Sequence, residues 1–250
     1  MKIKKRVHVA PVGFEYDRIM EPALKLRADK IYLLHYNQSD AIETEFHQEL
    51  WKNLEDNRVE LEKVGCDIFD LYDSIGSIAE ITSKHSRDDV YVNVSAGSKI
   101  TAIGGMIACM TTDATAYYVK PDRYNVQEQT RDGIDDIQPV SVGVEEIEEL
   151  PVYPIDSPER QEIMVLDYIM REGEVTKMDI IEYCENMELS FISDSEADSD
   201  KAKYRLLETH ITEPLKTEGY ICEEKVGRQR RISLTNAGEN ALRAFGFKMN

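Results

Sequence analysis

The chain has 250 residues, and its 30 Lys and Arg stand against 48 Asp and Glu, a formal net charge of -18. This length allows one large domain or two small domains, each able to bury a core. The acidic balance argues against a general polyanion binder, because affinity for nucleic acid comes largely from cationic contacts to phosphate. The longest apolar stretch, near 103–110, is far shorter than the ~20 residues of a membrane span. With no secretory signal in Met1–Ala10 either, we expect a cytoplasmic protein without a membrane partner.

The cysteines and histidines show no metal-ligand spacing. The 4 cysteines are far apart in the chain, and the 5 histidines do not complete a ligand pattern with them. We therefore expect reduced thiols, no disulfide framework, no metal site and no cofactor.

Strands and helices alternate in residues 1–150. The sequence predicts strands at 6–10, 31–35, 67–72, 90–95 and 114–119, and an edge strand at 138–144. It predicts helices at 14–28, 39–63, 74–85 and 99–110. Continuous apolar strands separated by helices indicate a parallel sheet that is covered on both faces. The predicted fold class is therefore α/β, with a Rossmann-like domain over residues 1–150.

The alternation of strands and helices ends at a linker candidate at 145–158, which is acidic and contains three prolines. Helices are predicted at 157–171, 176–185 and 201–218, a hairpin at 220–225 and 231–234, and a closing helix at 236–245. An acidic, Ser-rich loop is expected at 190–200. This order is typical of a winged helix-turn-helix, which we assign to residues 151–250.

Basic residues gather in the part that would contain the recognition helix and the wing. Residues 201–250 carry ten basic and six acidic side chains, whereas the rest of the chain is strongly acidic. A recognition helix contacts bases with its N-terminal residues, and arginines at a wing tip can reach phosphates or a minor groove. The predicted contacts to double-stranded DNA are Lys201, Lys203, Tyr204 and Arg205 in the helix and Arg228, Arg230 and Arg231 in the wing. An adaptor that docks a protein partner through this domain is an open alternative, which the acidic loop favours.

Two short loops follow the first and fourth predicted strands, at the edge of the sheet where open α/β folds bind ligands. The predicted ligand-binding residues are Val12, Gly13 and Phe14 in the first loop and Ser95, Ala96, Gly97, Ser98 and Lys99 in the second. Free backbone N–H groups at a helix N-terminus and the charge of Lys99 favour an anionic ligand. Neither loop has the dinucleotide or the P-loop pattern, so we do not expect an NAD enzyme or an NTPase. Gly104 and Gly105, in the helix that follows, indicate close packing, either on the sheet or at a subunit interface.

The turn at 11–14, the segment from Asn93 to Lys99 and the C-terminal winged helix together resemble the archaeal CARF–winged-helix regulators, where CARF denotes the CRISPR-associated Rossmann fold. The segment is similar to that family's Asn-x-Ser/Thr-Gly-Gly-Thr-Lys motif, with Ala96 and Ser98 in place of Gly and Thr. The resemblance implies a homodimer that binds a cyclic oligoadenylate across its two-fold axis. It also implies that Ala96 adds a methyl group where the backbone approaches the ligand.

These observations predict a dimeric, ligand-responsive, DNA-binding transcriptional regulator, linked through the resemblance to CRISPR defence. Some CARF domains cleave their own ligand, and Ser98 and Lys99 could assist attack on a phosphate. No general base is evident in the sequence, so a non-enzymatic sensor is the first expectation and a ring nuclease the alternative.

Overall fold

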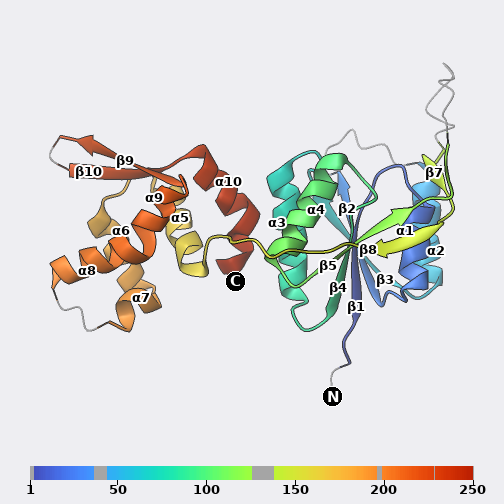
Figure 1. The fold of residues 1–250 in the computed structure, drawn as a ribbon, viewed down its shortest axis with the longest axis horizontal. Helices are drawn as coiled ribbons and strands as arrows, with labels where there is room; N and C mark the ends of the chain where they lie inside the picture. Colours follow the sequence, from blue (N-terminus) through green and yellow to red (C-terminus); the bar gives the residue numbers. More distant parts are fainter. Residues whose placement is uncertain (1–2, 37–43, 126–137, 196–198, 228, 250) are drawn as a thin grey trace. The chain divides into compact units, whose positions relative to one another are not determined.

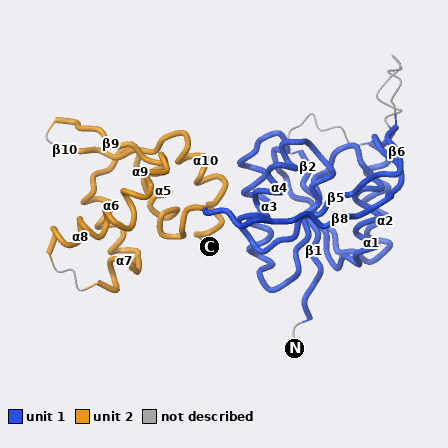
Figure 2. The backbone as a smooth tube through the Cα atoms, viewed as in Figure 1, with its two compact units in different colours: residues 1–156 blue, residues 157–250 orange. Residues whose placement is uncertain are grey.

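The structure, a computed structural model, describes residues 3–36, 44–125, 138–195, 199–227 and 229–249. The chain divides into two compact units, Met1–Asp156 and Ser157–Asn250 (Figure 2). Residue 150, where the sequence analysis ends the first domain, lies inside the first unit. Among the described residues, no helix is long and apolar enough to cross a membrane.

The first unit contains a mostly parallel six-stranded sheet in the order β3-β2-β1-β4-β5-β8. Its parallel strands are β1 (Arg6–Pro11), β2 (Lys30–Tyr36), β3 (Glu60–Cys66), β4 (Asp89–Asn93) and β5 (Thr115–Lys120), and β8 (Glu146–Glu149) is antiparallel to β5. Figure 1 shows α1 (Asp17–Lys25) and α2 (Glu45–Asp56) on one face of the sheet and α3 (Leu71–Lys84) and α4 (Lys99–Thr111) on the other. The α/β fold predicted from the alternating pattern is confirmed.

The central strands are apolar because both of their faces are covered. Ala10, Ile31 and Leu33 pack with the inner sides of α1 and α2. On the opposite face, a Cβ on Gly104 would lie 2.8 Å from the Cβ of Ser74, and one on Gly105 would lie 3.1 Å from a methyl of Val94. Both glycines of α4 therefore permit close packing inside the unit, against α3 and the sheet.

The third strand was predicted in the wrong place. The helix expected over 39–63 ends at Asp56, and β3 occupies Glu60–Cys66 where helix had been expected. Residues 67–72, expected as a strand, form a loop and the start of α3. β3 is an edge strand with mostly exposed polar residues, so it lacks the continuous apolar run of a central strand.

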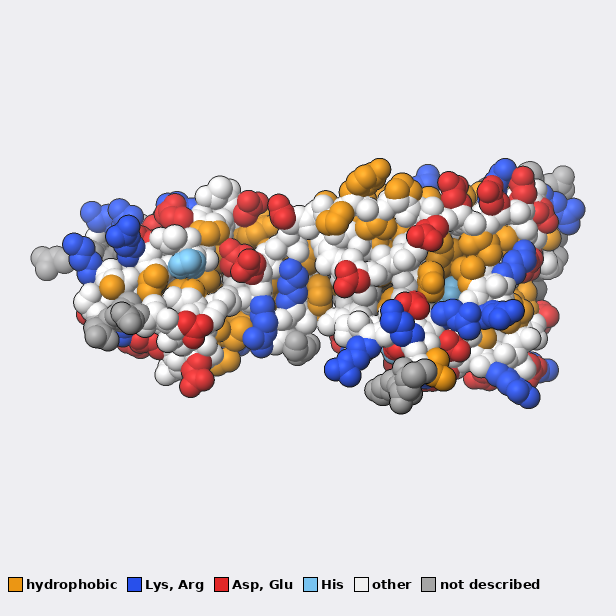
Figure 3. Space-filling view, turned by 60° about the horizontal axis from the view of Figure 1, so that its bottom comes forward, with side chains coloured by type: hydrophobic (Ala, Val, Ile, Leu, Met, Phe, Trp, Pro, Cys, Tyr) orange, Lys and Arg blue, Asp and Glu red, His pale blue; other side chains and the backbone are white. Residues whose placement is uncertain are grey.

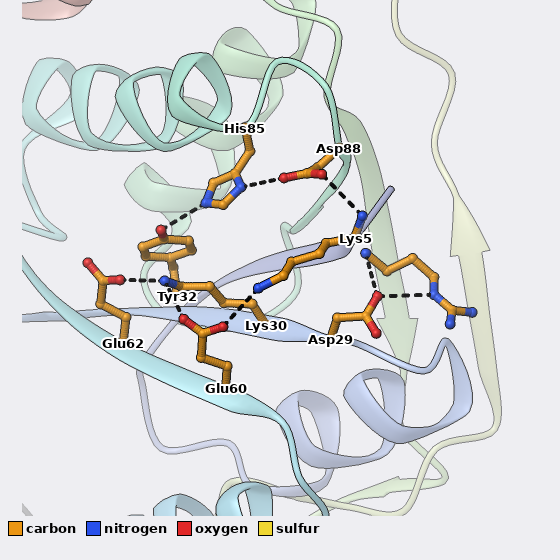
Figure 4. A network of polar contacts seen from close by, with 9 residues as sticks. Lys5, Asp29, Lys30, Tyr32, Glu60, Glu62, His85 and Asp88 are labelled. Atoms are coloured by element: carbon orange, nitrogen blue, oxygen red, sulfur yellow. Dashed lines mark hydrogen bonds and ion pairs between the residues drawn. The ribbon is translucent and has the colours of Figure 1, made fainter. Parts of the chain in front are cut away.

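A polar network holds this edge strand to its neighbour at the amino ends of the strands (Figure 4). The Nζ of Lys30 lies 3.0 Å from a carboxylate oxygen of Glu60 and 2.7 Å from one of Glu62. Burial by itself would lower the pKa of Lys30, but the two carboxylates overcome it and raise the pKa above its usual value. His85 continues the network, because its ring nitrogens lie 2.9 Å from the hydroxyl of Tyr32 and 2.8 Å from Asp88.

The linker candidate at 145–158 is partly a strand. Its acidic first part forms β8, which closes the other edge of the sheet, and the expected strand at 138–144 shrinks to β7 (Ser141–Val142), paired with β6 (Arg123–Tyr124). The chain after β8 stays attached to the unit. The backbone N–H of Leu150 donates to the carbonyl of Ala116 at 2.9 Å, and that of Ile155 donates to the carbonyl of Met110 at 3.1 Å.

The second unit is a winged helix, as predicted. Its elements are α5 (Arg160–Glu172), α6 (Lys177–Asn186), α7 (Ser190–Ser193), α8 (Asp200–Leu207), the π-helical turn η2 (Glu208–Thr212), α9 (Glu213–Thr217), β9 (Ile221–Val226), β10 (Gln229–Leu234), α10 (Asn236–Phe245) and the 3₁₀ turn η3 (Gly246–Met249). Val175 pairs with Ile232 and adds an isolated bridge to the hairpin. The core is formed by inward residues of these elements, among them Ile163, Leu166, Ile180 and Leu207.

Three details of this unit differ from the prediction. α5 begins at Arg160 with Glu159 as its N-cap, and not with Ser157 and Pro158. The acidic loop contains the short helix α7, and residues 196–198 of that loop lie outside the described residues. The third predicted helix continues through η2 directly before α9, which contains Pro214. The wider turn accommodates a proline that cannot donate a helical hydrogen bond.

Candidate functional site

The two predicted loops meet at the carboxyl edge of the sheet. Gly97 has a φ of +76°, and a Cβ there would lie 2.6 Å from the Cβ of Pro11. A Cβ on Gly13 would lie 3.1 Å from the Cα of Gly97. The close approach of the two backbones therefore requires glycine at 97 and leaves little room at 13.

The β4 loop is held by Asn93. Its side-chain oxygen accepts hydrogen bonds from the backbone N–H and the hydroxyl of Ser95, and its amide donates to the carbonyl of Arg18 at 2.8 Å. Ala96 is 1% exposed and its side chain belongs to the core. The methyl group that Ala96 adds to the motif therefore points into the core of the unit and not toward the surface of the loop.

Ser98 is the N-cap of α4 and Lys99 is its first residue, and they differ in whether their side chains are free to contact a ligand. The Ser98 hydroxyl accepts from the backbone N–H of Thr101 at 3.0 Å and donates to the carbonyl of Ile68. This hydroxyl is used as an N-cap and as a tie to the loop after β3. Lys99 is exposed in the first turn of the helix, and no described residue forms an ion pair with it. Lys99 thus presents an exposed positive charge beside the two loops.

The β1 loop is anchored from α2. The carbonyl of Gly13 accepts a hydrogen bond from Nε2 of His47 at 2.7 Å, so the other ring nitrogen accepts from the backbone N–H of Thr44 at 3.1 Å. The backbone N–H of Val12 donates to the carbonyl of Leu34. Phe14 is 37% exposed, and its ring centroid lies 6.1 Å from that of His47. Phe14 is therefore positioned to offer an aromatic surface at the rim of the site.

Sequence reasoning missed Glu15 as a site residue. Its side-chain oxygen Oε2 accepts from the backbone N–H of Gly97 at 3.3 Å, and the residue is only 7% exposed. Burial raises the pKa of Glu15, and the Gly97 N–H and the charge of Arg18 offset only part of that effect. The Glu15 carboxylate therefore accepts the hydrogen bond from the Gly97 N–H, a group that the sequence predicts as a donor to an anionic ligand. The buried part of the site therefore contains the acidic side chain of Glu15, and its exposed part contains the basic side chain of Lys99.

Arg18 and two tyrosines extend the site toward β5. The Nε of Arg18 donates to the carbonyl of Val119 at 3.0 Å, and its guanidinium lies 5.3 Å from the centre of the Tyr118 ring. Tyr124, 61% exposed in β6, interacts with Tyr118 through its hydroxyl, and this raises its pKa. Hydroxyl groups and a carboxylate near an exposed aromatic ring suit the polar edges of a base or a ribose better than a second phosphate.

The winged-helix unit presents basic side chains around its hairpin, and Figure 3 shows Lys and Arg gathered there. Arg228 lies outside the described residues. The side chain of Arg230 is 70% exposed. In the hairpin register Arg230 is opposite Lys225 and Arg231 is opposite Glu224, so Arg230 and Arg231 point to opposite faces. Sequence alone treated the wing arginines as equivalent, and their register separates them.

Of the residues predicted at the start of α8, Lys201 and Arg205 are exposed. Lys203 forms an ion pair with Glu185 of α6. Tyr204 is half-buried and packs against the core of the unit. The helix therefore presents two of its four predicted contacts to solvent, while the other two also serve the fold.

No group of three or more His, Cys, Asp or Glu side chains that could hold a metal ion occurs within the described ranges. The cysteines are free thiols, and three of them are buried. Burial raises the pKa of Cys66 to about 11 and that of Cys109 to about 12. These thiols are protonated, unreactive parts of the core at neutral pH.

Each unit matches a different family model. Residues 6–124 match the model described as "HFX_2341_N:-like, N-terminal", and residues 161–246 match the DUF6293 C-terminal winged helix domain. Among curated proteins, an uncharacterized protein of Methanocaldococcus jannaschii, MJ1513, is 29% identical over 195 residues. That alignment covers 69% of this chain and only 58% of the relative.

Two solved structures align with nearly the whole chain. Can2 from Sulfobacillus thermosulfidooxidans, solved in complex with cyclic tetra-adenylate, matches with a TM-score of 0.42 and 13% identity over 97% of this chain and 64% of its own. VC1899 from Vibrio cholerae matches with a TM-score of 0.38 and 12% identity over 97% of this chain and 65% of its own. Both TM-scores are below 0.5, so these similarities assign no function to this chain.

Proposed function

We propose that the protein is a homodimeric transcriptional regulator that binds a cyclic oligoadenylate, or a related anionic nucleotide, and double-stranded DNA. One observation carries this proposal. A single chain joins an α/β unit, whose two apposed glycine loops have a lysine at their rim, to a winged helix with an exposed arginine on its hairpin. The first unit would sense the ligand and the second would hold DNA. By linkage, each ligand would change the affinity for the other.

The ligand site offers both phosphate and base recognition. Lys99 and the N-terminus of α4 favour a phosphate at the rim. The buried carboxylate of Glu15 cannot form a hydrogen bond with an unprotonated phosphate, because neither group has a donor. It can accept a hydrogen bond from an amino group or a hydroxyl. Adenine carries such an amino group and ribose such a hydroxyl. The combination supports a nucleotide over inorganic phosphate.

A homodimer is supported by the surface around α4. This helix carries no charged residue after Lys99, yet Ile103 is 51% exposed, and nearby Phe69 is 63% exposed. Phe69 belongs to the loop between β3 and α3, which the hydrogen bond from Ser98 to Ile68 holds beside the start of α4. Uncharged, apolar surface of this kind is typical of a surface that another protein covers. A two-fold contact here would place two copies of Lys99 near one another, which suits a symmetric ring of phosphates.

We propose that the ligand is sensed and not cleaved. The Ser98 hydroxyl, the nearest candidate to assist attack on a phosphate, is committed to Thr101 and Ile68. Incubation with cyclic tetra-adenylate should therefore return the intact ring by chromatography. Appearance of linear products would favour the ring-nuclease alternative.

Neutralising Lys99 should weaken ligand binding. We expect isothermal calorimetry of the full chain to show one cyclic tetra-adenylate per two chains, and the affinity of Lys99→Gln to fall by about tenfold, since a charge-assisted contact to phosphate is lost. The matched control is Lys84→Gln, which removes the same charge at the end of α3 and breaks a pair with Glu80. Equal affinities of the two variants would contradict the assignment of Lys99.

The two described wing arginines should differ in their effect on DNA binding. Arg230 faces the side of the hairpin that lies near α8, whereas Arg231 faces the other side and donates to Gln229 at 3.3 Å. We expect Arg230→Ala to reduce duplex affinity and to lower the slope of log affinity against log salt by about one, with a smaller effect of Arg231→Ala. Fluorescence anisotropy across a salt series measures both. Absence of any salt-dependent duplex binding by the unaltered protein would favour the adaptor alternative.

A further inference from the structure

A groove of about 440 Å³ lies on the winged-helix unit, outside the residues predicted from the sequence except for Tyr204 and Arg230. It is bounded by the start of α6, by α8 with η2, and by the hairpin. Its lining residues are Thr176, Lys177, Met178, Tyr204, Glu208, Glu223, Gln229 and Arg230. The groove therefore separates the recognition helix from the wing.

A buried carboxylate lies among cations in this groove. The side chain of Glu223 is 10% exposed, and its oxygens lie 3.5 Å from Arg230, 3.8 Å from Lys177 and 3.9 Å from Lys216. Its Oε1 has no hydrogen-bond partner. Lys177 makes its closer contact, 2.7 Å, to Glu208, and this contact lowers the pKa of Glu208. Lys216 lies equally close, at 3.9 Å, to Glu213, so the three cations face three carboxylates and the cluster is neutral as a whole.

The geometry of a DNA duplex indicates that the backbone of one DNA strand would lie over the groove. A winged helix that places its recognition helix in the major groove and its hairpin tip in the adjacent minor groove must pass one DNA strand between them. That strand would run over the groove between α8 and β10. A phosphodiester there would replace the glutamates as the anionic partner of Lys177 and Arg230.

Building on the proposed DNA-binding function, we propose that this groove is a phosphate-binding site for the DNA strand that lies between recognition helix and wing. Lys177 and Arg230 exchange their contacts with Glu208 and Glu223 for the phosphate. In the DNA-free protein the two glutamates keep the cations gathered and neutralised, so they also limit non-specific binding. Lys177, which no motif of the sequence singled out, is then a DNA-contacting residue.

The test is duplex binding by the full chain, measured by fluorescence anisotropy over a salt series with mixed-sequence DNA about two helical turns long. We expect Lys177→Gln to weaken binding to all sequences and to reduce the salt slope by about one, while Lys177→Arg restores both. We expect Glu223→Gln to strengthen binding several-fold, because a competing carboxylate is removed. Thermal unfolding of each variant checks that the unit is intact.

Glu224→Gln is the matched control for Glu223→Gln, since it makes the same charge change on the next residue of β9 but on the opposite face. A larger gain for Glu223→Gln than for Glu224→Gln supports the groove site. Equal gains, or an unchanged salt slope in Lys177→Gln, would overturn it while leaving the DNA-binding function in place. If the unaltered protein binds no duplex, the proposed function fails, and the groove site is excluded with it.

Discussion

Gly97→Ala is expected to destabilise the first unit by roughly 3 kcal/mol and to remove ligand binding. Two effects add at this position. The φ of +76° is unfavourable for an L-residue, and the new Cβ would lie 2.6 Å from the Cβ of Pro11, inside the contact between the two loops. Urea denaturation followed by circular dichroism gives the loss of stability, and calorimetry gives the loss of binding.

Gly219→Ala separates the two effects. Gly219 also has a positive φ, +75°, but a Cβ there would have nothing within 4 Å. We expect this variant to lose only about 1 kcal/mol, the cost of the backbone conformation. If both variants lose the same stability, the loop contact at Gly97 contributes nothing beyond the backbone conformation.

His8 is expected to make stability strongly dependent on pH between about 6.5 and 4. It is fully buried in β1, its Nδ1 lies 3.1 Å from the hydroxyl of Tyr117, and its Nε2 has no partner. Burial, with a smaller contribution from Arg6, lowers the pKa of His8 to about 4. As the pH falls, His8 therefore becomes protonated near pH 6.5 in the unfolded chain but only near pH 4 in the folded chain. At ~1.4 kcal/mol per pKa unit, stability should fall by roughly 3 kcal/mol as the pH falls through this window.

The variant His8→Gln keeps a polar group opposite Tyr117 and removes the titration. Its stability should no longer fall as the pH drops from about 6.5 to 4, whereas the exposed His210→Gln should keep the slope of the unaltered protein. The single tryptophan, Trp51, lies in α2, so its fluorescence reports on the unit that contains His8. Glu15 acts in the opposite direction, since its raised pKa makes stability fall as the pH rises above the usual glutamate value. A slope that survives in His8→Gln would show that other groups control the acid response.

The central strands and the starts of α6 and α10 were predictable because their signals are local. β1 and β2 are apolar runs, and α6 and α10 begin where Thr176 and Thr235 supply capping oxygens. The edge strands β3 and β8 were not predictable in the same way. Their polar residues resemble surface helix or linker, and β3 is stabilised by partners distant in sequence, such as Lys30 for Glu62.

The site was half predictable for a similar reason. Glycines after buried strands, followed by a lysine at a helix start, mark the two loops by their own residue types. The roles of Glu15 and Lys177 depend on residues they meet only after folding, Gly97 for the first and Glu208 for the second. Nothing in the residues adjacent to them in sequence distinguishes either side chain from an ordinary surface charge.

The segment that leaves the first unit has a mechanical consequence. Ile155 is fastened to Met110, in the last turn of the helix whose first turn carries Lys99. An α-helix is stiff along its axis, so a displacement at the N-terminal end of α4 also moves its C-terminal end, to which Ile155 is hydrogen-bonded. If the proposed ligand displaces α4 when it binds, the displacement would be passed directly to the segment between Ile155 and the start of α5 at Arg160.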